Sequence, residues 1–227
     1  METCEVYQPP REKTMKYTTE PLQPGLTYHI YNRGNNRENL FIEERNYPYF
    51  LSLYAKYIEP IADTYSYCLI RNHFHMSTRI KTEEEWRKTL RETSQVSETC
   101  EVLKFNPSRA FSNLFNAYAK AINKGYQRTG SLFEERFGRI PVTTDAYLAN
   151  LIFYIHYNPQ KHKFVKDFRD WNWSSYPALI GSGETKLKRE KVLSLFGGQK
   201  GFLDFHQGKL DEKELVMFTD EEFDAET

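Results

Sequence analysis

The segment His73-Phe74-His75 constrains this chain more than any other, because two histidines stand one residue apart inside an extended hydrophobic pattern. Successive side chains of a β-strand point to opposite faces, so both imidazoles lie on one face and Phe74 points into the core. Two neutral imidazoles on one face are a natural pair of metal ligands. Taken alone, however, such a pair is more often ordinary surface or core histidine.

The composition is that of a folded protein with one substantial domain. A chain of 227 residues with 39% hydrophobic and 15% aromatic residues can fill a real core. It contains no apolar run of about 18 residues, the length of a transmembrane helix. The N-terminus lacks a signal-peptide pattern, and the three cysteines are too widely spaced for a disulfide framework or a metal knuckle. We therefore expect a cytoplasmic protein without membrane association.

Charge is distributed unevenly along a chain whose net charge is zero. From Lys209 to the C-terminus, eight acidic residues stand against two lysines, so this tail carries −6 and residues 1–208 carry +6. A basic body with an acidic tail is typical of proteins that handle a polyanion. It is equally typical of a tail that only improves solubility.

Hydrophobic periodicity and turn residues predict an α+β domain. The expected strands span 26–33, 63–71 and 73–80, with a strand or hairpin at 131–142, and the expected helices span 43–58, 82–92, 107–126 and 143–158. This order predicts an antiparallel sheet covered by helices, of the ferredoxin-like (split βαβ) kind. We expect this domain at 25–180, with a charged insertion at 81–104, an irregular lead-in at 1–24 and a C-terminal extension with the acidic tail at 181–227.

The last predicted helix carries a second pair of polar residues, Tyr154 and Asn158. They are four residues apart, so they share one face of the helix. A tyrosine hydroxyl next to an oxygen ligand is what a metal-assisted attack on phosphorus needs, and the Asn158 carbonyl oxygen would be a third ligand beside His73 and His75. A packed tyrosine and a helix C-cap are the commoner roles of such residues. His156 lies on another face and is expected to be structural.

Five segments in this order carry a resemblance to a known family. They are Tyr28 to Arg37, Ile70 to Met76, Gly130 to Phe137, Tyr154 to Pro159 and Trp173 to Tyr176. In these segments the chain resembles the single-tyrosine transposases of the HUH nuclease superfamily, in the branch associated with repetitive extragenic palindromes (REP). The resemblance spans about residues 25–180. Two departures are the polar run Met76-Ser77-Thr78-Arg79 and the length of the charged stretch at 81–104.

The resemblance implies a role for each of the four polar residues. His73 and His75 are metal ligands with Asn158 as the third, the cofactor is Mg²⁺ or Mn²⁺, and Tyr154 is the catalytic nucleophile. The enzyme would nick and rejoin DNA by transesterification, through a 5′-phosphotyrosine and a free 3′-hydroxyl. Because the phosphodiester energy is kept, no nucleotide cofactor is needed. The chain accordingly has no P-loop motif.

The partner implied by the resemblance is single-stranded, hairpin or palindromic-repeat DNA, whose unstacked bases meet aromatic and arginine side chains. The arginines that flank the motifs are the expected DNA contacts: Arg33, Arg37, Arg136 and Arg139. A homodimer is possible in this family. The alternative is a DNA-binding module on the same fold that has lost catalysis. A two-histidine phosphoesterase is disfavoured, because only His75-Met76-Ser77 fits a His-x-Ser/Thr element.

Overall fold

The computed structural model describes residues 21–92 and 104–208. It is an α+β fold with one four-stranded sheet of order β2-β3-β1-β4, in which all neighbouring strands are antiparallel. The elements are β1 (Thr27–Arg33), η1 (Asn35–Arg37), α1 (Asn46–Tyr57), β2 (Ala62–Ile70), β3 (His73–Ile80), α2 (Glu83–Glu92), α3 (Pro107–Gly125), β4 (Gly138–Val142), α4 (Asp145–Lys161), η3 (Phe168–Asp170), α5 (Tyr176–Ile180), α6 (Arg189–Leu195) and α7 (Gln199–Gln207). The predicted antiparallel, ferredoxin-like architecture is confirmed.

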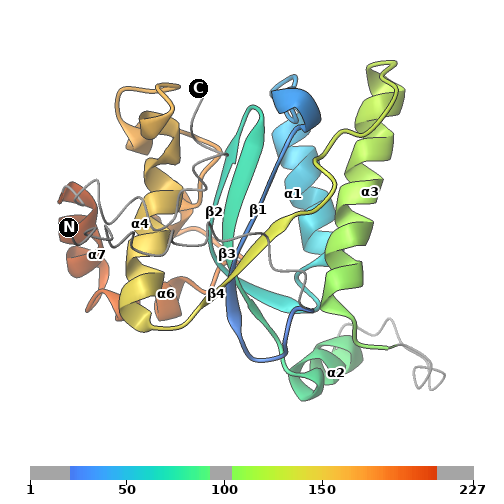
Figure 1. The fold of residues 1–227 in the computed structure, drawn as a ribbon. Helices are drawn as coiled ribbons and strands as arrows, with labels where there is room; N and C mark the ends of the chain where they lie inside the picture. Colours follow the sequence, from blue (N-terminus) through green and yellow to red (C-terminus); the bar gives the residue numbers. More distant parts are fainter. Residues whose placement is uncertain (1–20, 93–103, 209–227) are drawn as a thin grey trace, which may run out of the picture.

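Helices cover both faces of the sheet, with α1 and α3 on one side and α4 on the other (Figure 1). Strand alternation assigns the side chains to these faces: Phe74, Met76 and Ile30 pack into the aromatic core beneath α1 and α3. Phe74 is fully buried there, which stabilises the fold by about 2–3 kcal/mol relative to an exposed ring. His73 and His75 therefore point to the other face, toward α4, as predicted.

The face toward α4 is closed by a smaller core. Cys68 and Ile70 of β2 pack against Leu151 and Ile155 of α4. The Thr144 hydroxyl caps α4 by accepting from the Tyr147 amide. The short helix α7 lies on the far side of α4 from the sheet, and α6 lies beside α4 and contacts β2 (Figure 1). The sequence after the predicted domain boundary at 180 thus contributes to the packing around α4.

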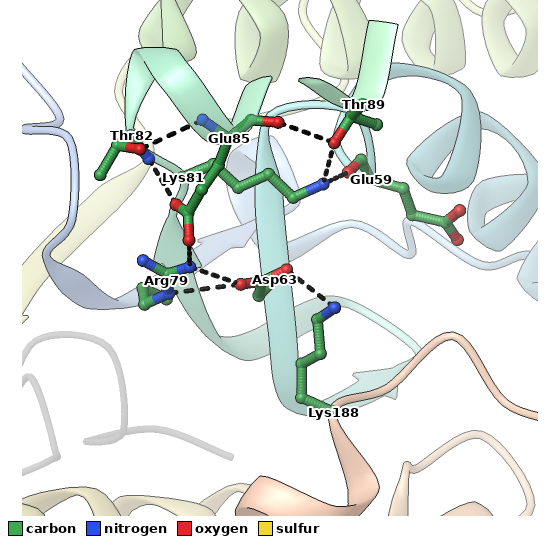
Figure 2. Close-up of polar contacts among 8 residues, drawn as sticks. All are labelled: Glu59, Asp63, Arg79, Lys81, Thr82, Glu85, Thr89 and Lys188. Atoms are coloured by element: carbon green, nitrogen blue, oxygen red, sulfur yellow. Dashed lines mark hydrogen bonds and ion pairs between the residues drawn. The ribbon is translucent and has the colours of Figure 1, made fainter. Parts of the chain in front are cut away.

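A polar cluster holds α2 and the chain after α5 to one end of the sheet (Figure 2). Arg79 of β3 lies opposite Asp63 of β2 and donates to its carboxylate at 2.9 Å and to Glu85 at 2.7 Å. Lys188 reaches the same Asp63 at 3.2 Å. At the start of α2, the Glu85 amide donates to the Thr82 hydroxyl and the Thr82 amide donates to the Glu85 carboxylate, a capping box.

Two predicted boundaries were wrong. The helix expected to end at Asn158 continues through Pro159 to Lys161. Proline removes only one helical hydrogen bond this close to the end, and the His162 amide closes the last turn on the Asn158 carbonyl. Of the strand or hairpin expected over 131–142, the structure has only β4, preceded by a single bridge between Phe133 and Gly34.

Several predictions fall on residues 1–20, 93–103 and 209–227, which lie outside the described residues. They concern most of the lead-in, the end of the charged insertion and the acidic tail. The domain boundaries therefore stay predictions. In the part of the chain that the structure describes, no helix is long and apolar enough to cross a membrane.

Candidate metal and nuclease site

His73 and His75 lie at the start of β3, beside β1 and beneath α4. They are 3% and 1% exposed. Tyr154 of α4 is fully buried above them, with its ring edge-on to His75 at a centroid distance of 5.5 Å. Asn158, one turn further along α4, places its Oδ1 3.3 Å from His73 Nε2. The four residues predicted from the sequence are thus brought together, and a single copy of the chain supplies all of them.

The hydrogen bonds around His73 indicate which atoms face Asn158. His73 Nδ1 lies 2.8 Å from Asn72 Oδ1, an acceptor, so in the neutral ring the proton is assigned to Nδ1. The Asn158 Nδ2 donates to the Tyr154 carbonyl at 3.2 Å, which leaves Oδ1 facing His73. Two lone pairs then meet at 3.3 Å, close to the distance of about 3 Å between neighbouring ligands of a divalent ion. This arrangement fits a shared cation.

The donor set also fits a metal. Within residues 21–92 and 104–208, no group of three His, Cys, Asp or Glu side chains could hold a metal ion. A site here therefore needs a donor of another type, and the Asn158 amide oxygen is in place. Burial, reinforced by the neighbouring histidines, holds the pKa of His75 well below its usual range. His75 is therefore neutral at neutral pH, the form that binds metal.

His29 of β1 is a site residue that the sequence interpretation missed. Its Nε2 lies 2.9 Å from His75 Nδ1, and its ring is 6.1 Å from that of Tyr154. Metal-binding histidines generally hydrogen bond through their second nitrogen, which fixes the tautomer and the ring orientation. His29 would do this for His75. The alternation His29-Ile30-Tyr31 was a usable signal, but only the pairing of β1 with β3 shows that these rings meet His75.

Tyr31 packs beside His29 and His75 because the neighbouring strand has a glycine opposite it. Its ring centroid lies 4.9 Å from His29 and 5.7 Å from His75. Gly138 of β4 pairs with Tyr31, and a Cβ at this position would collide with the tyrosine ring. The absence of a side chain at Gly138 thus gives the Tyr31 ring its position against His29 and His75.

The last turn of α4 adds a positive charge to the site, and this turn lies beyond the helix end predicted from the sequence. Lys161 Nζ lies 5.2 Å from the centroid of the Tyr154 ring. Just after the helix, the His162 ring is 4.8 Å from that of His73. Both residues reach the site because the helix continues beyond Pro159. Lys161 makes this end of the site more cationic, which suits a phosphate.

The predicted DNA-contacting arginines are not equivalent in the structure. Arg33 lies opposite His73 in the sheet and pairs with Glu134 at 2.5 Å. Arg37 and Arg136 are exposed. Arg139 is opposite Ile30, so it faces the α1 and α3 side, where its guanidinium stacks on Phe137 at 4.2 Å. The structure therefore brings only Arg33 close to the histidines in the sheet, and DNA binding by these arginines remains a prediction.

Two comparisons with known proteins agree with this fold. A solved structure of a REP-associated tyrosine transposase bound to a REP hairpin aligns with a TM-score of 0.53 at 13% identity, over 74% of this chain and 87% of that one. This likeness shows that the chain has the fold of that transposase. No family model matches the chain.

The sequence comparison points to the same group. A REP-associated tyrosine transposase of Haemophilus influenzae is 26% identical over 121 residues, which are 50% of this chain and 58% of the relative. The matched part thus spans little more than half of that relative's length. In sequence and in fold, the chain is similar to the REP-associated tyrosine transposases, and the resemblance seen in the sequence motifs is confirmed.

Proposed function

We propose that this protein is a metal-dependent DNA transposase that nicks and rejoins single-stranded or hairpin DNA through Tyr154. The observation that carries the proposal is the convergence of Tyr154 and Asn158 from α4 on His73 and His75 from β3. Helix and strand are far apart in sequence, and their side chains meet as a nucleophile beside a ligand set. Structural histidines would not require this combination.

His73, His75 and Asn158 would hold one divalent ion, Mg²⁺ or Mn²⁺. When bound, the ion neutralises charge on the phosphate and polarises the phosphorus. Imidazole ligands favour Mn²⁺ in affinity. His29 fixes the ring of His75, and Asn72 fixes the ring of His73, so both imidazoles are oriented before DNA arrives.

Tyr154 carries out the bond exchange. Its hydroxyl loses a proton as the oxygen attacks phosphorus, the new bond forms to the tyrosine oxygen, and the bond to the 3′-oxygen breaks. The products are a 5′-phosphotyrosine and a 3′-hydroxyl that has taken up a proton. Attack of a 3′-hydroxyl on the phosphotyrosine reverses the exchange and joins strands. Lys161, 5.2 Å from the tyrosine ring, would stabilise the negative charge on the attacking oxygen and the phosphate.

The proposed substrate follows from the site and from the similar structure. Lys161 at one end of the site favours an anion, and a solved structure with a similar fold carries a REP hairpin. We therefore propose that the chain acts on palindromic repeats whose hairpins leave unpaired flanking bases. Since one copy contains the whole site, a homodimer is not needed for chemistry and remains a prediction.

Incubation with labelled hairpin DNA and Mn²⁺ tests the proposal. The wild-type protein is expected to nick the strand and to form a denaturant-resistant adduct, and EDTA should abolish both. Tyr154→Phe should lose the adduct while still binding the hairpin. The matched control is Tyr157→Phe on the same helix, which should react like the wild type because Tyr157 stacks on Phe153, away from the histidines.

A catalytically inactive DNA-binding module on this fold is the second candidate. It predicts hairpin binding that neither Mn²⁺ nor Tyr154→Phe changes, and no nicking by the wild type. The intact set of His73, His75, Tyr154 and Asn158 favours the enzyme. Nicking by Tyr154→Phe at the wild-type rate would remove Tyr154 from its proposed role.

A further inference from the structure

A hollow of about 380 Å³ lies next to the turn that leads into His73 and plays no part in the chemistry above. Its walls include Tyr47 at the start of α1, Arg71 in the β2–β3 turn, and Trp171 and Trp173 from the segment after η3. This volume is within the range of small-ligand pockets, about 300–1,000 Å³. The hollow is therefore large enough to receive a flat ring system.

The walls of the hollow are stacked aromatic rings. Phe41 and Trp173 each stack on Tyr47, at centroid distances of 4.5 and 4.7 Å and interplanar angles of 9° and 7°. Trp173 is the half-buried member of this stack. Trp171 is fixed nearby, because its indole nitrogen donates to the Leu69 carbonyl at 2.9 Å. A flat ligand that enters the hollow therefore meets rigid aromatic surfaces without having to order them first.

Arg71 supplies a donor at the same place. Its side chain is exposed, and among the described residues its guanidinium has no hydrogen bond or ion pair within the chain. Burial raises the pKa of Tyr47 to about 12, and the positive charge of Arg71 opposes that rise. Both residues line the hollow. An arginine that has no partner among the described residues, beside stacked aromatics, suits the edge and face of a nucleobase.

The remaining charges favour a base over a phosphate. Glu43, Glu44 and Asp170 also line the hollow, and all three are exposed. Carboxylates repel a phosphate but accept hydrogen bonds from the amino and imino groups of a base. The mixture of one arginine with several carboxylates is thus complementary to a base edge, which presents both acceptors and donors.

The hollow and the proposed catalytic site share one structural element. Arg71 lines the hollow, Asn72 accepts from His73, and all three residues are consecutive. We propose that this hollow binds one unpaired nucleobase of the DNA strand whose phosphate is presented to Tyr154. The inference rests on the proposed function and adds to it how the position of the nick is selected. The bound base determines which phosphodiester reaches His73.

The test uses the full-length protein as Tyr154→Phe, which prevents cleavage, and a set of hairpins in which each unpaired base in turn is replaced by an abasic site. One position is expected to lose about 5- to 150-fold in affinity, the contribution of a single stacked base. Replacing that base by 2-aminopurine should give quenched fluorescence on binding. Equal affinity for every abasic hairpin, within twofold, would overturn the inference.

Variants locate the captured base in the hollow. Trp173→Leu and Arg71→Gln should each reduce the ratio of affinities between the intact and the abasic hairpin, Trp173→Leu toward one. Arg71→Gln is exposed and leaves the packing intact, so its result stands even if Trp173→Leu fails to fold. The control is Arg91→Gln, an exposed arginine on α2, which should keep the wild-type ratio. An unchanged ratio in Arg71→Gln and in folded Trp173→Leu would place the base elsewhere.

The proposed function and this inference fail differently. If the protein with Tyr154 intact nicks none of the hairpins, the result counts against the proposed nuclease function. The ratio of affinities between intact and abasic hairpins then still tests base binding in the hollow. Nicking with an adduct, but at a position that the abasic substitutions do not shift, counts against the hollow alone.

Discussion

Acid should destabilise this protein partly through two buried histidines that join α4 to α7. The Tyr67 amide and the ring of His156 both bond to the Ser175 hydroxyl, His156 Nδ1 lies 2.9 Å from His206 Nε2, and His206 Nδ1 lies 2.8 Å from the Phe202 carbonyl. One placement of the protons satisfies all of these hydrogen bonds. The Ser175 hydroxyl donates to His156 Nε2, and His156 Nδ1–H donates to His206 Nε2. His206 Nδ1–H then donates to the Phe202 carbonyl. With these tautomers, protonating His206 would place its Nε2–H against the Nδ1–H of His156. Protonating His156 would place its Nε2–H against the hydroxyl proton of Ser175.

The loss in the free energy of unfolding can be calculated from the pKa of His206. Burial lowers its pKa from 6.5 to about 4, and that of His156 also falls well below its usual value. Because the folded pKa is the lower one, the unfolded chain binds more protons between pH 6.5 and 4, and stability falls with acid in that window. Between pH 7.5 and 5.0, His206 alone removes about 2 kcal/mol from the free energy of unfolding.

Urea denaturation of the wild type and His206→Gln at these two pH values measures this contribution. Glutamine does not titrate, so the variant should be less stable by about 1–2 kcal/mol at pH 7.5, where a buried hydrogen bond is lost. It should then lose about 2 kcal/mol less than the wild type on going to pH 5.0. Equal pH dependence of the free energy of unfolding in the two proteins would refute the proposal that His206 is neutral in the folded protein.

Two further substitutions test the packing around the sheet. Gly138→Ala should lower the free energy of unfolding by about 1–3 kcal/mol, since the added methyl group collides with Tyr31, and it should slow nicking; Gly183→Ala, where the space is open, should change neither urea midpoint nor rate. Arg79→Ala should cost about 2–3 kcal/mol in urea melts, because the largely buried Asp63 carboxylate loses two hydrogen bonds from the guanidinium and keeps only Lys188 as a charged partner. The exposed Arg91→Ala should stay within about 0.5 kcal/mol, and an equal loss there would contradict the ion-pair argument.

The parts of the site that follow from local periodicity could be predicted from the sequence. The period of two in β3 placed His73 and His75 together, and the spacing of four in α4 placed Tyr154 and Asn158 on one face. Both patterns are fixed within a single element. The structure adds that the two elements lie against each other.

The parts that depend on pairing between elements could not be predicted. His29 meets His75 only because of the β1–β3 register, and Arg139 faces away from the histidines because of its pairing with Ile30. Lys161 lies beyond the helix end predicted at Asn158 for a different reason: the helix continues through Pro159, because a proline costs little near the end of a helix.

Whether His73, His75, Tyr154 and Asn158 form one metal-dependent nuclease centre is tested most directly by locating the residue that becomes attached to DNA. After reaction of the protein with hairpin DNA and Mn²⁺, proteolysis and mass spectrometry should find the 5′-phosphate of the cleaved strand on the peptide that contains Tyr154. Asn158→Ala, which removes the oxygen ligand, should yield little or none of this peptide. Attachment to another residue, or nicked DNA with no attached peptide, would contradict the site described above.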